Sequence, residues 1–564
     1  MDESGKTYPP QALPVQFQTA QNYPAQSYPA QNYPAPSYPA QNYPAQSYPA
    51  QNYPAPSYPA QNYPAQNYPA QNYPAQNYPA QNYPAQNYPA QHYPSAPPQH
   101  LNVLNIPPDQ GCMANRRNQP QSQAVGAAGL IFISGGMNIA FSVGIRYMVG
   151  LSVHVRICWF IGAIIGAIIS GFLANRVSKK YILQFSSILV TIGGIVLACT
   201  YHKVPAITAA LYLDGIANGL IFAPTLALIG EISVCQKRGG LAIGIEQLCY
   251  GAGIVLQTIF GTIWWWYRDT GFSSLQSHGI LSAVFGGIAL IFASIFTIES
   301  PVIMLANGEE QAAIHALRRL QRPSILTTDT YQQLDEHKRY LALNKDLTVG
   351  ESISEAIPAF VRLVTLRALN AMSLTKFVVD AMLMVTILRF KKAVWPYAVF
   401  GVGRFFGQIV AVFCVDSVGR KKLLLGGLLL ASGMAFGLGS QFSYEGLLLY
   451  QYNSVDVVLA LLIVFQAFAG LAFAPTSAYL SEGFPLGIKQ HCIGFTFIME
   501  MLVYVIICVC DWSISGTRAY FFVVGAFYFL SFVAGIWSFP ETKLTPLRVA
   551  QDKFRSFFAP GFQP

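Results

Sequence analysis

Ionisable side chains occur inside long apolar stretches of this sequence, where a charge is costly. Five of them are Asp214, Glu246, Lys376, Asp380 and Glu500. Each costs about 2.5–3.5 kcal/mol at the centre of a membrane-spanning helix, so such residues usually face a polar cavity or one another. Carboxylates and amines in a cavity can bind a polar solute or carry a proton. The sequence therefore predicts a polar binding site within an apolar bundle.

Two pairs among these residues and their neighbours have a defined spacing. Glu246 is followed by Gln247, and a helix places adjacent residues about 100° apart, so both can flank one cavity. Glu246 could then serve a proton-coupled carrier, or it could simply face a polar neighbouring helix. Lys376 and Asp380 are one helical turn apart and can pair with each other, which would make them structural; alternatively, both contact solute.

The composition shows which elements must position these side chains. The chain has 564 residues, of which 53% are hydrophobic and only 10% charged, whereas soluble domains carry about 25% charged residues. This composition indicates a membrane protein. The net charge of +9 fits basic cytoplasmic loops rather than nucleic-acid binding. The cysteines form no disulfide framework or zinc spacing, so we expect no metal, no cofactor and no enzyme.

A thirteen-residue pattern occurs twice in the apolar part of the chain. Gly219–Glu231 returns as Gly470–Glu482, with eight identical positions. A base follows each copy seven residues after the glutamate, as Arg238 and Lys489. Internal repetition determines architecture before any single motif does, and duplicated apolar halves are typical of secondary transporters.

Twelve apolar runs are long enough to cross a bilayer, which takes about 20 residues each. The predicted fold is therefore all-α and integral to the membrane, with twelve transmembrane helices in two pseudo-symmetric halves, 124–301 and 357–541. The predicted spans are 127–149, 154–174, 181–201, 205–230, 240–262, 279–298, 368–388, 394–415, 423–441, 455–481, 490–511 and 518–539.

The remaining segments are polar. Residues 302–356 carry apolar side chains at helical spacing and predict a cytoplasmic helical loop, and 542–564 form a short tail. Lys and Arg gather in alternate connections, so we expect both termini in the cytoplasm and a multi-pass protein of the plasma membrane.

The N-terminal segment 1–123 is dominated by a five-residue Gln-(Asn/Ser)-Tyr-Pro-Ala repeat. Frequent proline and scarce aliphatic residues predict a disordered tail. It could be a spacer, or a multivalent docking segment for a protein partner.

Several motifs together resemble the sugar porter family of the major facilitator superfamily. The first motif is Glu231-Ile-Ser, followed by Arg238-Gly239 and Gln247. The other three motifs are Asp416-Ser-Val-Gly-Arg-Lys421, Glu299-Ser-Pro301 and Pro540-Glu-Thr-Lys543. The resemblance covers about 125–550 and implies two halves that rock about a central sugar site. It also implies that charges at the cytoplasmic helix ends latch the halves together. The matching positions are Arg176, Glu231, Arg238, Glu299, Asp416, Arg420, Glu482 and Lys489.

The chain departs from the family pattern in places. Asn175, Ser178 and Lys179 stand where the family has an acid, a glycine and an arginine, and only Gln247 is retained among the sugar-contacting positions. The candidate substrate-binding residues are Gln247, Glu246, Asn370, Lys376, Asp380 and Glu500.

Three functions stay open at this stage. The first is a carrier of a hexose or similar polyol by alternating access, with proton coupling undecided. The second is a carrier of a charged small solute that pairs with Lys376, Asp380 or Glu500. The third is a non-transporting receptor or scaffold that signals through its repetitive tail.

Overall fold

The computed structural model describes residues 116–144, 152–266, 273–345, 347–391, 395–443, 452–511 and 513–556. Within these ranges the chain is helical throughout. The predicted disordered tail, 1–123, lies outside the described residues up to 115; its predicted end is too late, because the first spanning helix already begins at Gln119.

Six spanning elements make up the first half, and one of them changes helix type along its length. They are α2 (Gln119–Gly144), α3 (Val153–Leu173), α4 (Lys179–Thr200), α5 (Val204–Ile232), the continuous run α6–η2–α7 (Arg238–Ile243, Gly244–Leu248, Cys249–Trp266) and α8 (Ser274–Phe296).

The second half repeats this layout, with one of its spans broken between α12 and α13. Its elements are α12 (Val349–Ser373) with α13 (Lys376–Phe390), α14 (Trp395–Val418), α15 (Arg420–Gln441), α17 (Tyr452–Phe473) with α18 (Pro475–Glu482), α19 (Lys489–Val509) and α20 (Ile514–Ser538). A reciprocal capping box between Thr348 and Glu351 fixes the start of α12.

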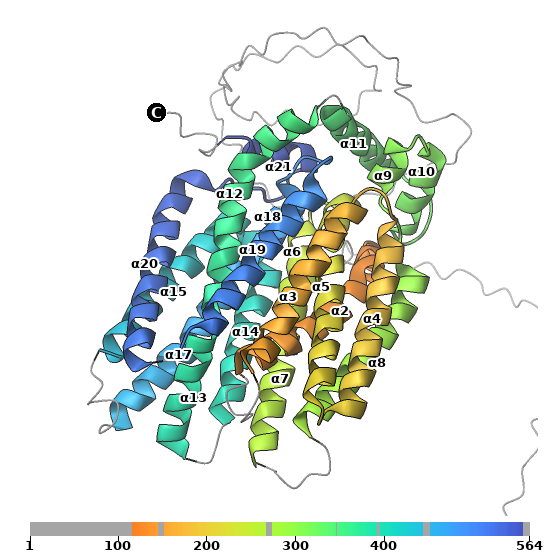
Figure 1. Cartoon of the computed structure of the whole chain (residues 1–564). Coiled ribbons are helices and arrows are strands. Elements are labelled where there is room, and N and C mark those ends of the chain that lie inside the picture. The colour runs from red at the N-terminus through yellow and green to blue at the C-terminus, as the bar shows by residue number, and fades with distance from the viewer. Residues whose placement is uncertain are drawn as a thin grey trace, which may run out of the picture. The chain divides into compact units, whose positions relative to one another are not determined.

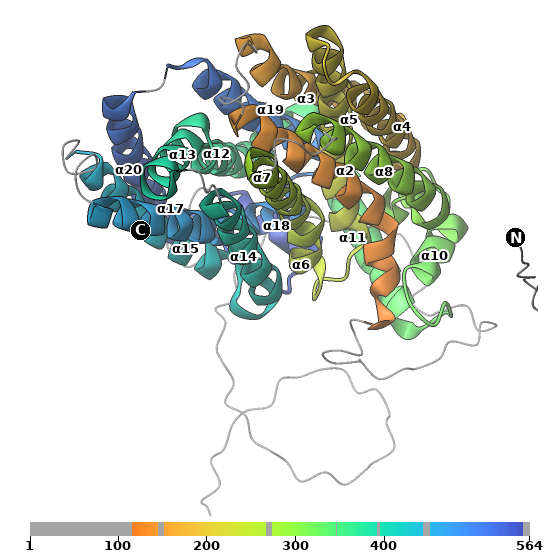
Figure 2. The same cartoon turned by 90° about the horizontal axis from the view of Figure 1, so that it is seen from below.

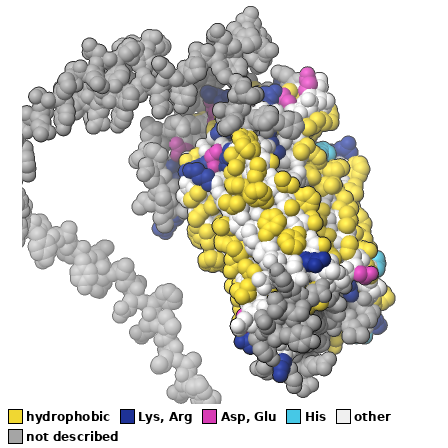
Figure 3. Space-filling model, turned by 90° about the vertical axis from the view of Figure 1, so that its left-hand side faces the viewer, with side chains coloured by type: hydrophobic (Ala, Val, Ile, Leu, Met, Phe, Trp, Pro, Cys, Tyr) yellow, Lys and Arg dark blue, Asp and Glu magenta, His cyan; other side chains and the backbone are white. Residues whose placement is uncertain are grey.

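Twelve helical runs of the described chain are long and apolar enough to cross a bilayer, which confirms the predicted number. Large apolar side chains are exposed on their outer faces, for example Phe413, Phe527 and Leu530. On the face shown in Figure 3 these side chains form a broad hydrophobic region, with charged groups towards its two ends. Such a surface suits lipid and not water.

Four short helices gather at one end of the bundle, above the spans (Figure 1). They are α9 (Pro301–Ala306), α10 (Glu310–Arg319), α11 (Thr328–Lys345) and α21 (Leu547–Phe554). Val302, Tyr340 and Leu547 form a small apolar cluster that joins α9, α11 and α21. This end is called the loop-bearing end below.

The two halves meet along a seam of paired helices. α3 of the first half packs against α19 of the second, and α7 packs against α14. Seen along the bundle, α7, α12, α14 and α19 lie towards the middle, whereas α4, α15 and α20 lie towards the outside (Figure 2). Side chains on the seam helices are therefore placed to line a central site.

Candidate functional site

A single π-helical turn brings two polar residues to the centre of the first half. The segment η2 interrupts the α-helical ladder between α6 and α7, and Glu246 and Gln247 lie within it. Only 1% and 4% of their surfaces are exposed. A π-turn widens the helix locally, and such turns are frequent at functional sites. Both side chains line one cavity, as the sequence predicted for adjacent helical positions.

Arg367 of α12 reaches across the seam to Glu246. Its Nη1 and Nη2 donate to the two carboxylate oxygens at 2.8 and 2.9 Å, which is the bidentate geometry of a strong ion pair. Nη1 also approaches Glu500 of α19 at 3.3 Å. The guanidinium lies 5.0 Å from the ring centre of Phe222. One buried cation thus connects carboxylates of both halves.

The break between α12 and α13 supplies further polar groups. The helix ends at Ser373, and the freed carbonyls of Leu369, Met372 and Ser373 accept hydrogen bonds from side chains of other helices. Asn370, one turn before the break, donates to Glu500 at 2.7 Å. Interrupted helices at the midplane are characteristic of transporter binding sites, because their free backbone groups need polar partners.

Arg404 of α14 is a second buried guanidinium in the same wall. It donates to the Ser373 hydroxyl at 2.7 Å, to Asn370 at 2.9 Å and to Gln466 at 3.3 Å. Its Nε has no hydrogen-bond partner, and within the described chain no carboxylate lies in ion-pair range of it. No carboxylate in the described ranges therefore pairs directly with Arg404, although Glu246 and Glu500 of the same cavity lie near enough to offset part of its charge.

The cavity between these residues is small in this conformation, with a volume of about 30 Å³. A buried water needs at least about 10–15 Å³, so the space holds about two waters and excludes a sugar. Its walls come from both halves, with Gln247 and Tyr250 on one side and Asn370, Arg404 and Glu500 on the other. The site must therefore widen to admit a solute.

The two remaining predicted binding residues lie elsewhere. Lys376 and Asp380 are buried on α13, but neither is among the residues that line the cavity. Lys376 Nζ donates to the carbonyl of Cys510 at 2.7 Å. Four of the six predicted substrate-binding residues therefore lie at the cavity: Glu246, Gln247, Asn370 and Glu500. Lys376 and Asp380 lie apart from it.

The predicted charge network occupies the loop-bearing end of the seam. Glu482 accepts from Arg420 at 3.1 Å and from the Thr542 hydroxyl at 2.6 Å, both within the second half. Arg238 of the first half approaches the same carboxylate at 3.9 Å. Asp416 accepts from the backbone N–H of Gly240 at 2.8 Å, which is a second contact between the halves.

The equivalent carboxylate of the first half pairs with a residue outside the predicted charge network. Glu231 pairs with Lys179 at 2.9 Å, and both side chains are almost fully buried. Arg176 is exposed in the preceding turn and lies outside this pair. Glu299 accepts from the Ser178 hydroxyl and thereby joins α4 to the end of α8.

Lys489 lies directly against the first half. A Cβ atom built on Gly230 would be 2.7 Å from Lys489 Nζ and 2.3 Å from the carbonyl oxygen of Ser481. Glycine is required here because the two halves touch through its α-carbon. Lys489 is 1% exposed, and among the described residues its Nζ has no hydrogen-bond partner.

The sequence reasoning missed three residues: Lys179, Arg367 and Arg404. Arg404 could have been found, because it lies inside the apolar run 394–415 and meets the criterion used for the five ionisable residues. Arg367 precedes the predicted span at 368 and reads as a loop cation. Only the early start of α12 places it inside the bundle.

The described ranges contain no group of three or more His, Cys, Asp or Glu side chains that could hold a metal ion. The polar groups around the cavity are instead guanidinium and amide groups that donate hydrogen bonds, carboxylates that accept them, and hydroxyls that do both. Such a set can form several hydrogen bonds to a polyhydroxylated solute.

Comparison with known proteins identifies the family. The family model described as "Sugar (and other) transporter" matches residues 117–554. The glucose transporter GlcP of Staphylococcus epidermidis is 25% identical over 352 residues, covering 60% of this chain and 73% of that protein. The arabinose-proton symporter of Escherichia coli is 26% identical over 324 residues, covering 55% of this chain and 65% of the symporter.

Among solved structures, the proton:xylose symporter XylE bound to 6-bromo-6-deoxy-D-glucose has the same fold. Its TM-score is 0.62 at 19% identity, and the match covers 77% of this chain and 99% of that one. The predicted major facilitator fold, with two six-helix halves, is therefore confirmed. On the evidence of its sequence match and its fold, this multi-pass membrane protein belongs to the sugar transporter family.

Proposed function

We propose that this protein moves a hexose or a similar polyol across a membrane by alternating access. The observation that carries the proposal is the buried polar cavity on the seam, with Gln247 from one half and Asn370 and Glu500 from the other. Sugars need convergent hydrogen bonds together with apolar surface. Tyr250 and Phe497 supply that surface in the same walls. The glucose and arabinose carriers among its relatives support this cargo.

Alternating access is proposed because the cavity is too small to hold a sugar in this conformation. A cavity of about 30 Å³ must open to load a sugar, and rocking of the halves opens one end at a time. The contacts of Arg238 with Glu482 and of Gly240 with Asp416 close the loop-bearing end. In the proposed cycle these contacts break when the site opens towards that end.

The proposal includes an orientation. The loop-bearing end faces the cytoplasm and both termini lie there, because Lys and Arg gather in the connections at that end. The plasma membrane is the proposed location. The repetitive tail is proposed as a docking segment for a protein partner, on the basis of its many Tyr-Pro copies.

Uptake into liposomes tests the cargo directly. The full-length protein is reconstituted and tested with labelled hexoses, pentoses and polyols. We expect saturable uptake of at least one, and a loss of at least about tenfold in Asn370→Ala, since a buried hydrogen bond to a charged partner is worth about 1.5–3 kcal/mol. Asn307→Ala, on an exposed helix end, is the matched control. A folded protein that moves none of these solutes would support the receptor alternative.

Proton coupling is tested with the same preparation. Glu246 is the proposed proton-carrying group because it is buried at the cavity and bonded across the seam. If Glu246→Gln and the wild type take up sugar equally at every external pH, the carrier does not use this carboxylate for coupling.

A second candidate cargo is favoured by Arg404. A buried guanidinium without a carboxylate partner is costly, and a solute that brings its own carboxylate would compensate it. This observation makes a sugar acid the second candidate cargo. In a competition assay, D-glucuronate should then displace a neutral sugar from the wild type but not from Arg404→Gln. Equal weak competition in both proteins would exclude the sugar acid.

A further inference from the structure

Asp214 of α5 lies inside the first half, apart from the central cavity. It is 4% exposed and is not among the residues that line that cavity. Its carboxyl group lies where α2, α3, α5 and α8 come together, four helices of the first half that are seen end-on in Figure 2. Water does not reach this depth, so the protein itself must satisfy the carboxyl group.

Three neutral side chains form the hydrogen bonds of this carboxylate. Trp159 Nε1 and Asn218 Nδ2 donate to Oδ1 at 2.8 and 2.9 Å, and the Ser134 hydroxyl donates to Oδ2 at 2.5 Å. Within the described ranges no Lys, Arg or His side chain forms an ion pair with Asp214. A buried charge that only neutral groups compensate is costly, and adding a proton removes that cost.

The titratable groups of the surrounding helices leave this charge unbalanced. α2 contains no ionisable side chain, and α4 contains none between Tyr181 and Cys199. His278 of α8 bonds to Gln257 of α7 at 2.9 Å instead. The other titratable groups that are wholly or partly buried on these helices and on α19 are Arg156, Cys158, Tyr250, Glu500 and Tyr504. In the described chain none of these groups bonds directly to Asp214.

The two oxygens of the carboxyl group have different kinds of partner. The N–H groups of Trp159 and Asn218 can only donate, so Oδ1 remains an acceptor, whereas the Ser134 hydroxyl can donate or accept. Ser134 Oγ also lies 3.0 Å from the hydroxyl oxygen of Ser282. A proton that adds to Oδ2 forms an O–H group that donates to Ser134 Oγ, and the hydrogen of Ser134 then turns towards Ser282. The site therefore accommodates the charged and the neutral carboxyl group without moving a helix.

A hydrogen-bonded link joins this carboxyl group to the central cavity. Asn218 donates to Asp214, and Tyr250, which lines the cavity, donates from its hydroxyl to Asn218 Oδ1 at 3.3 Å. α2 packs closely over the link, since a Cβ atom on Gly135 would lie 2.7 Å from the Tyr250 ring and closer still to Asn218 Oδ1. A solute that draws the Tyr250 hydroxyl away therefore alters the bonding of Asn218 to the carboxyl group. Solute and proton then change each other's affinity by the same factor.

We propose that Asp214 binds a coupling proton during the transport cycle, as a second proton site beside the one proposed at Glu246. The proton comes from water on the side that is open, forms the O–H bond at Oδ2, and returns to water on the other side as the carboxylate is restored. Glu246 is bonded to two nitrogens of Arg367, whereas protonation of Asp214 breaks no ion pair. The inference rests on the proposed transport function and adds a second proton site to it.

Infrared difference spectra of the purified full-length protein test proton binding without a transport assay. The spectrum in acidic buffer minus that in alkaline buffer should contain the carbonyl band of a protonated carboxyl group. Asp214→Asn should lose one component of this band, and it should fold because its amide keeps the bonds from Trp159 and Asn218. Ser134→Ala should shift the frequency of that component, because the O–H group loses its acceptor. Ser186→Ala, which removes another buried hydroxyl of the first half, should match the wild type. An unchanged band in Asp214→Asn overturns the proposal.

Accumulation in liposomes tests the coupling itself. Each coupled proton contributes a factor of about ten to the steady-state accumulation of solute per unit of pH gradient. Asp214→Asn should lower accumulation by about that factor, while solute counterflow, which needs no net movement of protons, should fall much less. Replacement of sodium by choline should change neither quantity.

The outcomes separate this proposal from the transport function on which it rests. The proton site is overturned if Asp214→Asn accumulates solute like the wild type, if accumulation requires sodium, or if a pH gradient drives no accumulation in a wild type that shows counterflow. A wild type that shows no counterflow with any solute contradicts the proposed transport function instead. In that case the infrared band still decides whether Asp214 binds a proton.

Discussion

At the scale of single residues, Arg367 explains how a buried ion pair can open during transport. It binds Glu246 of the opposite half with both terminal nitrogens, and it also lies 3.3 Å from Glu500 of its own half. When the halves separate, Arg367 loses one carboxylate and keeps the other. Because a buried cation is never left without a partner, the large cost of an isolated charge is avoided. This arrangement allows the contact between the halves to break and form again at a small cost in free energy.

Removal of the carboxylate of Glu246 tests this interpretation. Breaking a buried ion pair typically costs about 3–5 kcal/mol; we expect Glu246→Gln near the lower end, since Glu500 still compensates Arg367. The variant should unfold at a lower temperature and lose uptake. The matched control is Asp456→Asn, which breaks an exposed pair with Arg389 at 2.6 Å and should cost at most about 1 kcal/mol. Equal losses in the two variants would contradict a special role for the buried pair.

The residues of the site were only partly predictable, for a physical reason. Ionisable residues inside apolar runs are visible in any sequence, and Glu246 and Glu500 were found in this way. Their shared partner Arg367 is not visible in this way, because it lies just before the predicted start of its apolar run at 368. The pairing of Glu231 with Lys179, which was not among the predicted charges, depends on which side chain points inward at the start of α4. The positions of the charges in the sequence do not show which of these side chains points into the bundle.

At the scale of elements, the break between α12 and α13 is stabilised by side chains of other helices. Gln466 of α17 donates to the carbonyl of Ser373 at 2.6 Å and also accepts from Arg404 at 3.3 Å. One buried amide therefore satisfies a free carbonyl and a buried cation. Water does not reach this position, since Gln466 is fully buried.

Replacing that amide should weaken the break. Gln466→Leu leaves a buried carbonyl unbonded and removes an acceptor from Arg404, and each loss costs about 1–3 kcal/mol. We expect a lower Tm together with reduced uptake. Gln184→Leu removes an exposed hydrogen bond between α4 and α8 and should change the free energy of unfolding by at most about 0.5 kcal/mol, so its Tm should stay close to that of the wild type. An unchanged Tm in Gln466→Leu would show that the break between α12 and α13 does not depend on the Gln466 side chain.

The sequence predicted the number of helices better than their continuity. Both copies of the thirteen-residue pattern contain a proline, Pro224 and Pro475. The first copy remains within the single helix α5, and the second runs from α17 into α18 with helical dihedral angles at Ala474 between them. Proline removes the same backbone donor in both places, and the helix continues past it in both. The break that the sequence did not predict lies instead between α12 and α13, inside the predicted span 368–388.

At the scale of the whole molecule, closure at the loop-bearing end depends on close backbone approach as well as on charge. Gly230→Ala places a methyl group 2.3 Å from the Ser481 carbonyl and 2.7 Å from Lys489 Nζ. The halves must shift apart, so the equilibrium moves towards the state that is open at this end. Labelling of a cysteine placed in the seam should become faster. Gly426→Ala, which would meet nothing within 4 Å, is the control, and equal labelling in both would contradict the prediction.

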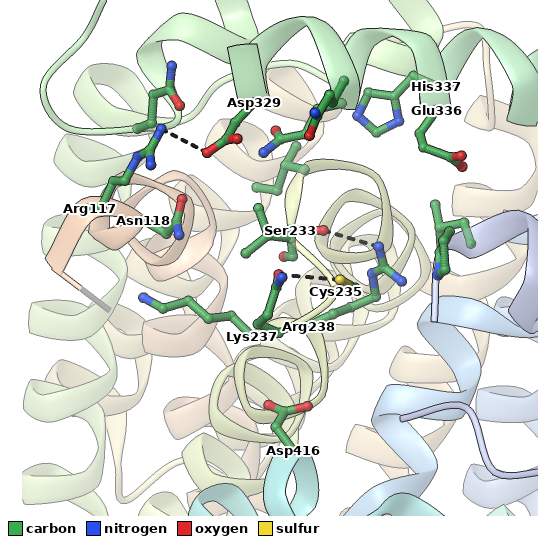
Figure 4. A pocket seen from close by; sticks show the side chains of 18 of the residues that line it. Arg117, Asn118, Ser233, Cys235, Lys237, Arg238, Asp329, Glu336, His337 and Asp416 are labelled. Carbon is green, nitrogen blue, oxygen red and sulfur yellow. Dashed lines mark hydrogen bonds and ion pairs between the residues drawn. The ribbon is translucent and has the colours of Figure 1, made fainter. Parts of the chain in front are cut away.

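His337 gives the closed arrangement a pH dependence that can be predicted with its sign. It lies on α11 among the residues that line a large cavity at the loop-bearing end, with a volume of about 970 Å³ (Figure 4). Partial burial lowers the pKa of His337 to about 4, and the nearby Arg238 guanidinium adds to this effect, whereas the pKa of an unfolded histidine is about 6.5. The unfolded chain therefore binds a proton first as the pH falls. Stability from this residue is complete above about pH 6.5 and is lost progressively down to about pH 4.

Thermal unfolding between pH 4 and 7.5 measures this loss. The Tm of the wild type should fall faster than that of His337→Gln as the pH drops from about 6.5 to about 4, because the variant cannot take up this proton. His315→Gln, on the exposed side of α10, should follow the wild type and serves as the control. Parallel curves for the wild type and His337→Gln would mean that α11 is not seated against Arg238 in the folded protein. The same result would remove α11 from the closed end of the seam, because the lowered pKa exists only while that helix covers the cavity.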